Sequence, residues 1–115
     1  MARSLISRLT GRRGIAPAAV ALAVLALGCS HRPPPRRVEI EMVGMGFKPD
    51  VVTLSVGDTV VWTNHDIVPH TATGTGFDTG TLAPSASGRF VAGHADTLDY
   101  TCGFHPTMKG RLIVL

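Results

Sequence analysis

The stretch YTCGFHPTMKG, residues 100–110, places three side chains with sulfur or nitrogen lone pairs close together. These side chains are Cys102, His105 and Met108. A thiolate and a thioether are soft donors and imidazole is intermediate, so the trio suits copper better than zinc, for which methionine is a poor ligand. Two imidazoles and a thiolate around copper, with a more distant thioether, form a blue-copper site. The stretch therefore predicts part of a copper site that needs a second histidine.

Cys102 alone would also fit a second role, that of a buried structural cysteine. It ends the alternating stretch 97–102, in which its thiol shares a face with apolar side chains and points inward. Gly103 lets the backbone turn after this strand, and Pro106 disfavours a helical conformation at His105. The three donors then lie on a tight loop that can curl around one point, which favours metal binding.

The second histidine has to come from the other histidines of the chain, which are His31, His65, His70 and His94. His31 lies in a proline-rich segment, and His94 lies in a glycine-rich turn that we expect to face solvent. His65 and His70 both follow the strand that contains Trp62, and by spacing either one could reach across a two-layered fold. His70 begins an apparent strand, HTAT, whereas His65 resembles a loop residue. The choice between His65 and His70 stays open on these grounds.

Short strands that could position these ligands recur through the C-terminal part of the chain. Apolar and polar residues alternate with a period of two in the stretches 38–42, 52–56 and 97–102, and β-branched residues fill 59–64. Residues 111–115 form an apolar closing strand, and no stretch has a convincing helical period of 3.6. Turn residues cluster between these runs, as in GTGFDTGTLAPSASG. The pattern predicts an all-β fold, a β-sandwich or a small barrel.

The N-terminal part of the chain has the composition of an export signal followed by a linker. Residues 1–14 contain arginines and no acid, and the apolar run 15–27 ends at a small Gly-Cys pair. The run is too short to span a bilayer, which takes about 20 residues. We expect three parts: a signal peptide at 1–28, a Pro/Arg-rich linker at 29–37 and one folded domain at 38–115.

Two finer features of the export signal stay open. Arg12-Arg13 is a partial twin-arginine pattern, because Gly11 stands where a serine or threonine is expected. The residues ALGC that end at Cys29 resemble a lipobox, although Ala26 replaces the usual larger aliphatic residue. A lipid on Cys29 would anchor the mature protein to a membrane surface. We expect an exported protein in the bacterial periplasm or on the outer face of a membrane.

The formal net charge of +3 reflects the N-terminal part rather than the domain. Most of the 11 basic residues precede Val38, whereas all 8 acidic residues follow it, so the folded domain is mildly acidic. The basic balance of the whole chain is therefore no argument for a nucleic-acid partner. Cys102 is the one cysteine of residues 38–115, which excludes an internal disulfide in the domain.

The motifs of residues 38–115 together resemble the cupredoxins of the plastocyanin, pseudoazurin and amicyanin group. The matching stretches, in chain order, are GFKPDVVTLSVGDTVVWTN, VPH, FDTGTLAPSASGRF and LDYTCGFHPTMKGRLIVL. The resemblance implies a Greek-key β-sandwich of about seven to eight strands. It also implies that His70, Cys102 and His105 are the equatorial ligands of one copper ion, which cycles between Cu(I) and Cu(II), and that Met108 is the axial ligand.

One position departs from the pattern of this family. The family commonly has an asparagine directly after the first histidine ligand, where it links the ligand loops and forms a hydrogen bond near the cysteine sulfur. This chain has Thr71 there. The hydroxyl and the backbone N–H of Thr71 could still form both contacts, so the departure concerns the tuning of the site.

The resemblance implies a one-electron carrier rather than an enzyme. Four protein ligands leave a metal no open position for a substrate. His105 would be the ligand nearest the surface, among apolar residues that could include Pro69, Phe104 and Pro106. Redox partner proteins would dock there briefly and weakly, and we expect the carrier to be a monomer.

Two other functions are compatible with the sequence. A protein for periplasmic copper trafficking or resistance would hand over the metal instead of electrons. Met42, Met45 and His94 are the residues that would favour this alternative, and they are few. A docking module for a larger oxidase is the third hypothesis.

Overall fold

The computed structural model describes residues 11, 14–21, 23 and 28–115. Residues Arg32–Leu115 form one compact unit, and the chain before Arg32 is a separate unit. Most of the expected signal peptide at 1–28 lies outside the described residues. Within the described parts, no helix has the length and hydrophobicity needed to cross a membrane.

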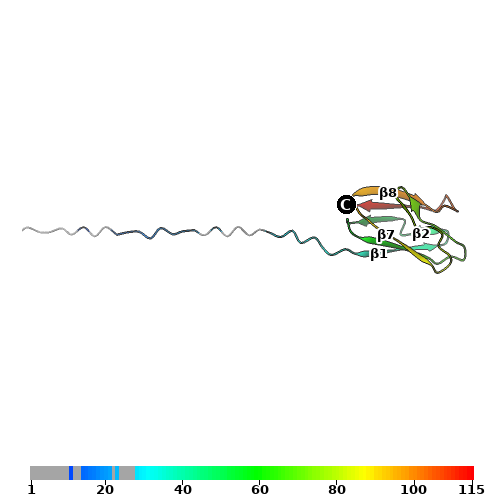
Figure 1. The fold of residues 1–115 in the computed structure, drawn as a ribbon, viewed down its shortest axis with the longest axis horizontal. Coiled ribbons are helices and arrows are strands. Elements are labelled where there is room, and N and C mark those ends of the chain that lie inside the picture. The colour runs from blue at the N-terminus through cyan, green and yellow to red at the C-terminus, as the bar shows by residue number, and fades with distance from the viewer. Residues whose placement is uncertain (1–10, 12–13, 22, 24–27) are drawn as a thin grey trace, which may run out of the picture. The chain divides into compact units, whose positions relative to one another are not determined.

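Arg32–Leu115 folds as two β-sheets packed face to face, with nine strands in the described residues (Figure 1). One sheet has the order β2-β1-β4-β7, with β1 at Arg37–Val43, β2 at Gly46–Lys48, β4 at Thr59–Asn64 and β7 at Ser87–Val91. The other has the order β3-β9-β8-β5-β6, with β3 at Val51–Leu54, β5 at Thr73–Gly74, β6 at Phe77–Asp78, β8 at Asp96–Thr101 and β9 at Lys109–Val114. The chain crosses repeatedly between the sheets, so β1 pairs with β4 and β3 with β9 in parallel. The predicted β-sandwich is confirmed.

The described residues form nine strands, whereas about seven to eight were expected. The positions of the strands also differ from the expected ones in three places. Two of them, β5 and β6, contain only two residues each and lie in the glycine-rich stretch for which the sequence predicts turns. The short strand β2 and the strand β7 were not predicted. The prediction of a strand at HTAT is wrong. His70 forms an isolated bridge with Leu82, and strand structure begins only at Thr73.

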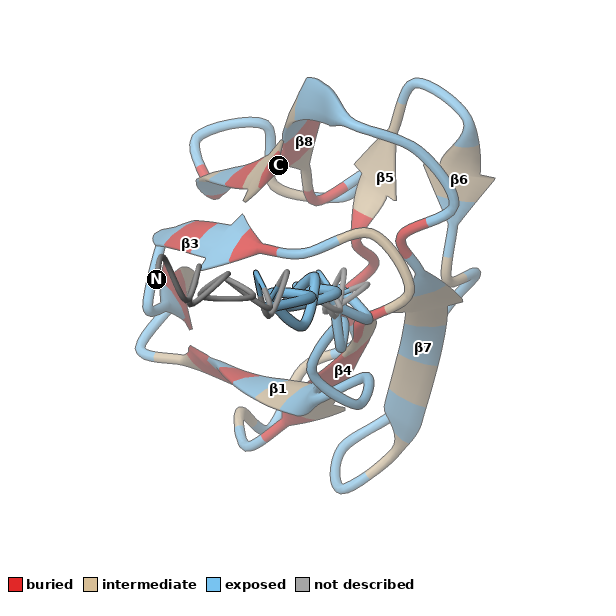
Figure 2. Cartoon of the chain, turned by 90° about the vertical axis from the view of Figure 1, so that its left-hand side faces the viewer, coloured by how far each residue is buried: buried red, intermediate tan, exposed pale blue. Residues whose placement is uncertain are grey.

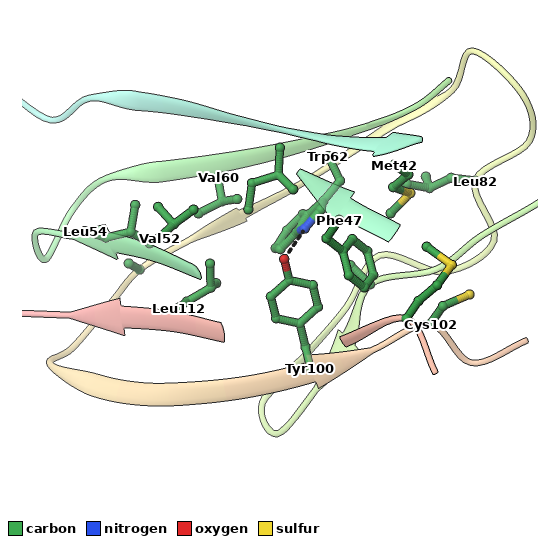
Figure 3. Close-up of a cluster of buried hydrophobic side chains, with 14 of the residues drawn as sticks. Met42, Phe47, Val52, Leu54, Val60, Trp62, Leu82, Tyr100, Cys102 and Leu112 are labelled. Carbon is green, nitrogen blue, oxygen red and sulfur yellow. Dashed lines mark hydrogen bonds between the residues drawn. The ribbon is translucent and has the colours of Figure 1, made fainter. Parts of the chain in front are cut away.

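The core between the two sheets is built around Trp62 of β4 and Tyr100 of β8. Figure 2 shows the alternation of buried and exposed residues along β1 and β3 that creates the inner faces. The Trp62 indole N–H donates a hydrogen bond to the Tyr100 hydroxyl at 3.2 Å and so links the sheets (Figure 3). Phe47 packs edge-on against Tyr100 with ring centroids 4.7 Å apart. The same cluster extends from Leu54 at one end to Cys102 at the other (Figure 3).

The last residues of the expected linker are held against the domain by Asp58. The buried Asp58 carboxylate accepts hydrogen bonds from the backbone N–H of Arg36 at 2.8 Å and of Ser55 at 2.9 Å, and it pairs with the Arg36 guanidinium at 2.9 Å. These bonds, the Arg36 N–H foremost, hold the pKa of the carboxyl below its ordinary value. Asp58 therefore fixes the point at which the chain enters β1.

Candidate metal centre

Three donor atoms converge at the end of the sandwich to which Cys102 belongs. The ligand atoms of His70, Cys102 and His105 all lie within 4.8 Å of one another. The two Nδ1 atoms are 3.2 Å apart, and Cys102 Sγ lies 3.7 Å from Nδ1 of His70 and 3.6 Å from Nδ1 of His105. A point equidistant from the three corners of such a triangle lies about 2 Å from each, which is the length of metal–ligand bonds. The three side chains thus fit one metal ion.

The loop that carries Cys102, His105 and Met108 is closed by its own backbone. The N–H of Cys102 donates to the carbonyl of Met108 at 3.1 Å, and the N–H of Met108 donates to the carbonyl of His105 at 2.9 Å. Cys102 and Met108 are each 1% exposed and belong to the same buried cluster. His105 is partly exposed. The inward Cys102 and the tight loop predicted from the sequence are confirmed.

His70 comes from the segment between β4 and β5 and is completely buried. Its backbone is fixed by the bridge to Leu82, with an N–H···O bond of 3.1 Å in one direction and 2.7 Å in the other. An ionised carboxylate only accepts hydrogen bonds, so we assign the ring proton of His70 to Nε2, which lies 2.8 Å from a carboxylate oxygen of Asp66. This tautomer leaves Nδ1, which faces the other two donors, free to bind a metal. His70 is therefore held in the tautomer and orientation that a metal ligand requires.

Within the compact unit, the two other histidines, His65 and His94, have contacts of their own. His65 is half-exposed, and its Nε2 is 3.8 Å from a carboxylate oxygen of Glu41. His94 is exposed beside Asp96, as expected. His31 is also exposed and precedes the compact unit. The geometry thus favours His70 over His65, a choice that residue spacing left open.

Asp66 supports the candidate ligand His70, a role that is not apparent from the sequence. One carboxylate oxygen accepts the His70 ring proton and the N–H of Met45 at 3.0 Å, and the other accepts the N–H of Gly44 at 2.8 Å. The Met45 N–H foremost, together with His70 and Gly44, holds the pKa of this carboxyl below its ordinary value. The position of Asp66, four residues before a candidate ligand, was the one feature of the sequence that could have indicated this role. The turn at residues 44–45 that completes its hydrogen bonds is distant in sequence.

Asn64, at the end of β4, fixes the loop that carries both Asp66 and His70. Its buried side-chain amide donates to the carbonyls of Val68 at 2.8 Å and Leu82 at 2.9 Å. Its side-chain oxygen accepts the N–H of Asp66 at 2.9 Å. Asn64 therefore fixes the backbone of the loop from which Asp66 and His70 project.

Thr71 makes both contacts expected at the position where the family has asparagine. Its backbone N–H donates to Cys102 Sγ at 3.4 Å, and its hydroxyl accepts the N–H of Gly103 at 2.8 Å. Burial by itself raises the pKa of the Cys102 thiol. The N–H groups of Thr71 and Phe104 and the two imidazoles outweigh burial and lower that pKa to about 6. These contacts thus favour the thiolate form of Cys102, which is the form that binds a metal.

We expect Asp66→Ala to weaken copper binding by about ten- to a hundredfold, because outer partners of ligating histidines contribute on this scale. The substitution frees the His70 ring to rotate and to change tautomer. Competition with a chelator of known affinity measures the change. Asp66→Asn keeps an acceptor oxygen and should lose less, and Asp99→Ala removes an exposed carboxylate bonded to Arg111 and should bind copper normally. Equal affinity in Asp66→Ala and Asp99→Ala would contradict the prediction.

Comparisons with known proteins agree with this geometry. Residues 16–114 match the family of cupredoxin-like domains. The chain belongs to the cupredoxin family. Amicyanin-alpha of Methylorubrum extorquens is 32% identical in an alignment of 106 residues, and the match covers 84% of this chain and 87% of that protein. Amicyanin of Paracoccus denitrificans is 28% identical in an alignment of 87 residues, and the match covers 67% of this chain and 64% of that protein.

Solved cupredoxin structures share the fold of this chain. A proline-to-phenylalanine variant of amicyanin in its reduced state is 26% identical, with a TM-score of 0.65, and the match covers 69% of this chain and 82% of that one. A methionine-to-alanine variant of amicyanin in its Cu(I) form is 24% identical over the same shares, with a TM-score of 0.66. The second likeness concerns the fold alone.

Proposed function

We propose that this cupredoxin is a type 1 copper protein that carries single electrons between redox partners. His70, Cys102 and His105 would hold the copper ion, with the Met108 thioether as the fourth donor. The observation that carries the proposal is the triangle of two Nδ1 atoms and one Sγ atom, with sides of 3.2, 3.6 and 3.7 Å, at a buried end of the sandwich. The cofactor is one copper ion, because two imidazoles, a thiolate and a thioether form a copper donor set.

The ligand residues are built to stay in place during electron transfer. Bound copper supplies a one-electron couple between Cu(I) and Cu(II). His70 is fixed by Asp66 and by its bridge to Leu82, and the loop 102–108 is closed by two backbone hydrogen bonds. Side chains that cannot move keep the reorganisation energy low, since little has to rearrange when the charge changes. This function needs no open coordination position and no catalytic group.

The route for electrons passes through the loops around His105. The exposed apolar residues on these loops include Phe104, which is 53% exposed, and Ile67, which is 93% exposed. Pro69 and Pro106 are exposed beside the two histidine ligands. The exposure of Phe104 supports a role in surface contact rather than in core packing. Exposed apolar residues on both ligand loops support brief docking of partner proteins by a monomeric carrier.

The N-terminal segments complete the proposal. Residues 1–28 serve as a signal peptide, 29–37 as a linker and 38–115 as the copper domain, and the mature protein works in the periplasm. Cys29 is exposed and free, which is compatible with cleavage before it and with attachment of a lipid. Mass spectrometry of the mature N-terminus distinguishes a soluble form from a lipid-anchored form.

The test separates an electron carrier from a copper-trafficking protein. We expect the copper-loaded protein to cycle reversibly in voltammetry and to retain its copper against a chelator through many cycles. Retention is expected because His70 and Cys102 are buried and Met108 is 1% exposed. Rapid loss of copper to the chelator, without a reversible redox wave, would favour trafficking and overturn the proposal.

A further inference from the structure

The hydroxyl of Thr71 is the first member of a chain of hydrogen bonds that leads away from the metal centre. Thr71 Oγ1 lies 2.8 Å from Thr73 Oγ1, and Thr73 Oγ1 donates to a carboxylate oxygen of Asp78 at 3.2 Å. At its other end Thr71 Oγ1 accepts the N–H of Gly103 at 2.8 Å. The chain thus connects the residue after Cys102 with an exposed aspartate of β6.

The number of available protons fixes which group donates in each hydrogen bond of this series. A carboxylate accepts hydrogen bonds and cannot donate, so the single hydroxyl proton of Thr73 points to Asp78. Thr73 can then only accept from Thr71, whose own proton is used in that bond. The remaining acceptor capacity of Thr71 Oγ1 takes the N–H of Gly103. Bonds that run in one direction toward a negative charge polarise and strengthen one another.

The local fold explains why these residues meet. Thr73 and Asp78 are directly opposite in the β5–β6 hairpin, where side chains of paired residues are neighbours. Thr71 lies just before this hairpin, two positions from Thr73, and its hydroxyl is within 2.8 Å of the Thr73 hydroxyl. Asp78 is held in turn by the N–H of Gly80, which donates to it at 2.7 Å. The hairpin therefore presents a fixed acceptor to Thr71.

We propose that Thr73 and Asp78 are positioning residues of the copper site, which act on the Cys102 thiolate through Thr71 and Gly103. Thr71 grips the ligand loop at two points, because its N–H donates to Cys102 Sγ and its hydroxyl accepts from Gly103. Without Thr73, the Thr71 hydroxyl loses its acceptor and can rotate, which loosens both contacts. The expected effect on copper rests on the proposed function. The hydrogen bond from the Gly103 N–H to Thr71 Oγ1 forms without copper.

The experiment measures the strength of the Gly103–Thr71 hydrogen bond in the metal-free protein. Amide hydrogen exchange of Gly103, followed by NMR, should be about three- to tenfold faster in Thr73→Val than in the wild type, which is the factor for one hydrogen bond. Thr73→Ser restores the hydroxyl and should restore slow exchange. Thr63→Val is the matched control, because it removes the 2.8 Å hydroxyl pair of Thr63 and Ser87 in the other sheet. Exchange of the Leu112 amide in β9 should be unchanged, which shows that the opening is local.

The reduction potential of the copper-loaded protein is a second readout, which tests whether these hydrogen bonds affect the metal. A weaker N–H bond to the thiolate favours the oxidised metal, so Thr73→Val and Asp78→Ala should lower the reduction potential of the copper-loaded protein, and Thr63→Val should not. Wild-type Gly103 exchange in both Thr73→Val and Asp78→Ala would overturn the inference, and so would equal potentials in Thr73→Val and Thr63→Val. A wild type that binds no copper would refute the proposed function instead. The exchange rate of the Gly103 amide would still show whether the hydrogen bonds through Thr71, Thr73 and Asp78 hold the ligand loop.

Discussion

Copper-loaded His70→Ala should lack the intense visible absorption of a type 1 site, whereas His65→Ala should keep it. His70 Nδ1 faces Cys102 Sγ and His105 Nδ1, so its removal deletes one corner of the donor triangle. Charge transfer from a thiolate to copper in this trigonal setting is the source of the absorption. Absorption spectra of both variants with equimolar Cu(II) make the comparison.

The two histidines are a well-matched pair for this experiment. They lie five positions apart on one loop, and His65 is half-exposed next to Glu41. Loss of the buried His70 ring leaves a cavity, so thermal unfolding of the metal-free variants should accompany the spectra. A folded His70→Ala protein with the wild-type spectrum, or a colourless His65→Ala protein, would show that the ligand is assigned wrongly.

Gly110→Ala should destabilise the metal-free protein by about 3 kcal/mol, at the upper end of the usual cost of overpacking. Gly110 is opposite Tyr100 in the β8–β9 pair. A Cβ atom added there would lie 2.2 Å from Tyr100 Cζ and 2.4 Å from its hydroxyl oxygen. The ring cannot move aside freely, because it is hydrogen-bonded to Trp62 and packed against Phe47. Denaturant-induced unfolding measures the change in the free energy of unfolding.

Gly93→Ala is the control for this substitution. It lies on the exposed turn between β7 and β8, and an added Cβ would meet no atom within 4 Å. Its free energy of unfolding should stay within about 0.5 kcal/mol of the wild type, as for ordinary surface substitutions. A change of that small size in Gly110→Ala would mean that Tyr100 does not cover the β9 backbone.

The fold and the loop ligands were predictable because their signals are local. Alternation placed Cys102 on an inward face, and the spacing to His105 and Met108 put three donors on one tight loop. The stretch 70–91 was predicted less well. In this stretch β5 and β6 are two-residue strands formed from threonine, glycine, phenylalanine and aspartate, and His70 is held by a single bridge rather than a strand. Local propensity carries little information about elements that tertiary pairing creates.

The residues that support the ligands were beyond the reach of local patterns. Asp66 is a functional group because it meets Gly44 and Met45, more than 20 positions earlier, and because His70 turns its Nε2 toward it. Asp78 reaches the metal loop only through the register of the β5–β6 hairpin. Long-range pairing decides such contacts. The choice of His70 over His65 needed the family resemblance for the same reason.

The absorption spectrum of the wild-type protein with one equivalent of Cu(II), recorded beside that of Cys102→Ser, tests the central claim most directly. The thiolate of Cys102 is the one cysteine sulfur of the domain, and it lies 3.6 to 3.7 Å from both imidazole nitrogens. We predict an intensely blue or green wild type and a variant without this colour. A colourless copper-loaded wild type, or an equally coloured Cys102→Ser protein, would contradict a type 1 copper site at His70, Cys102, His105 and Met108.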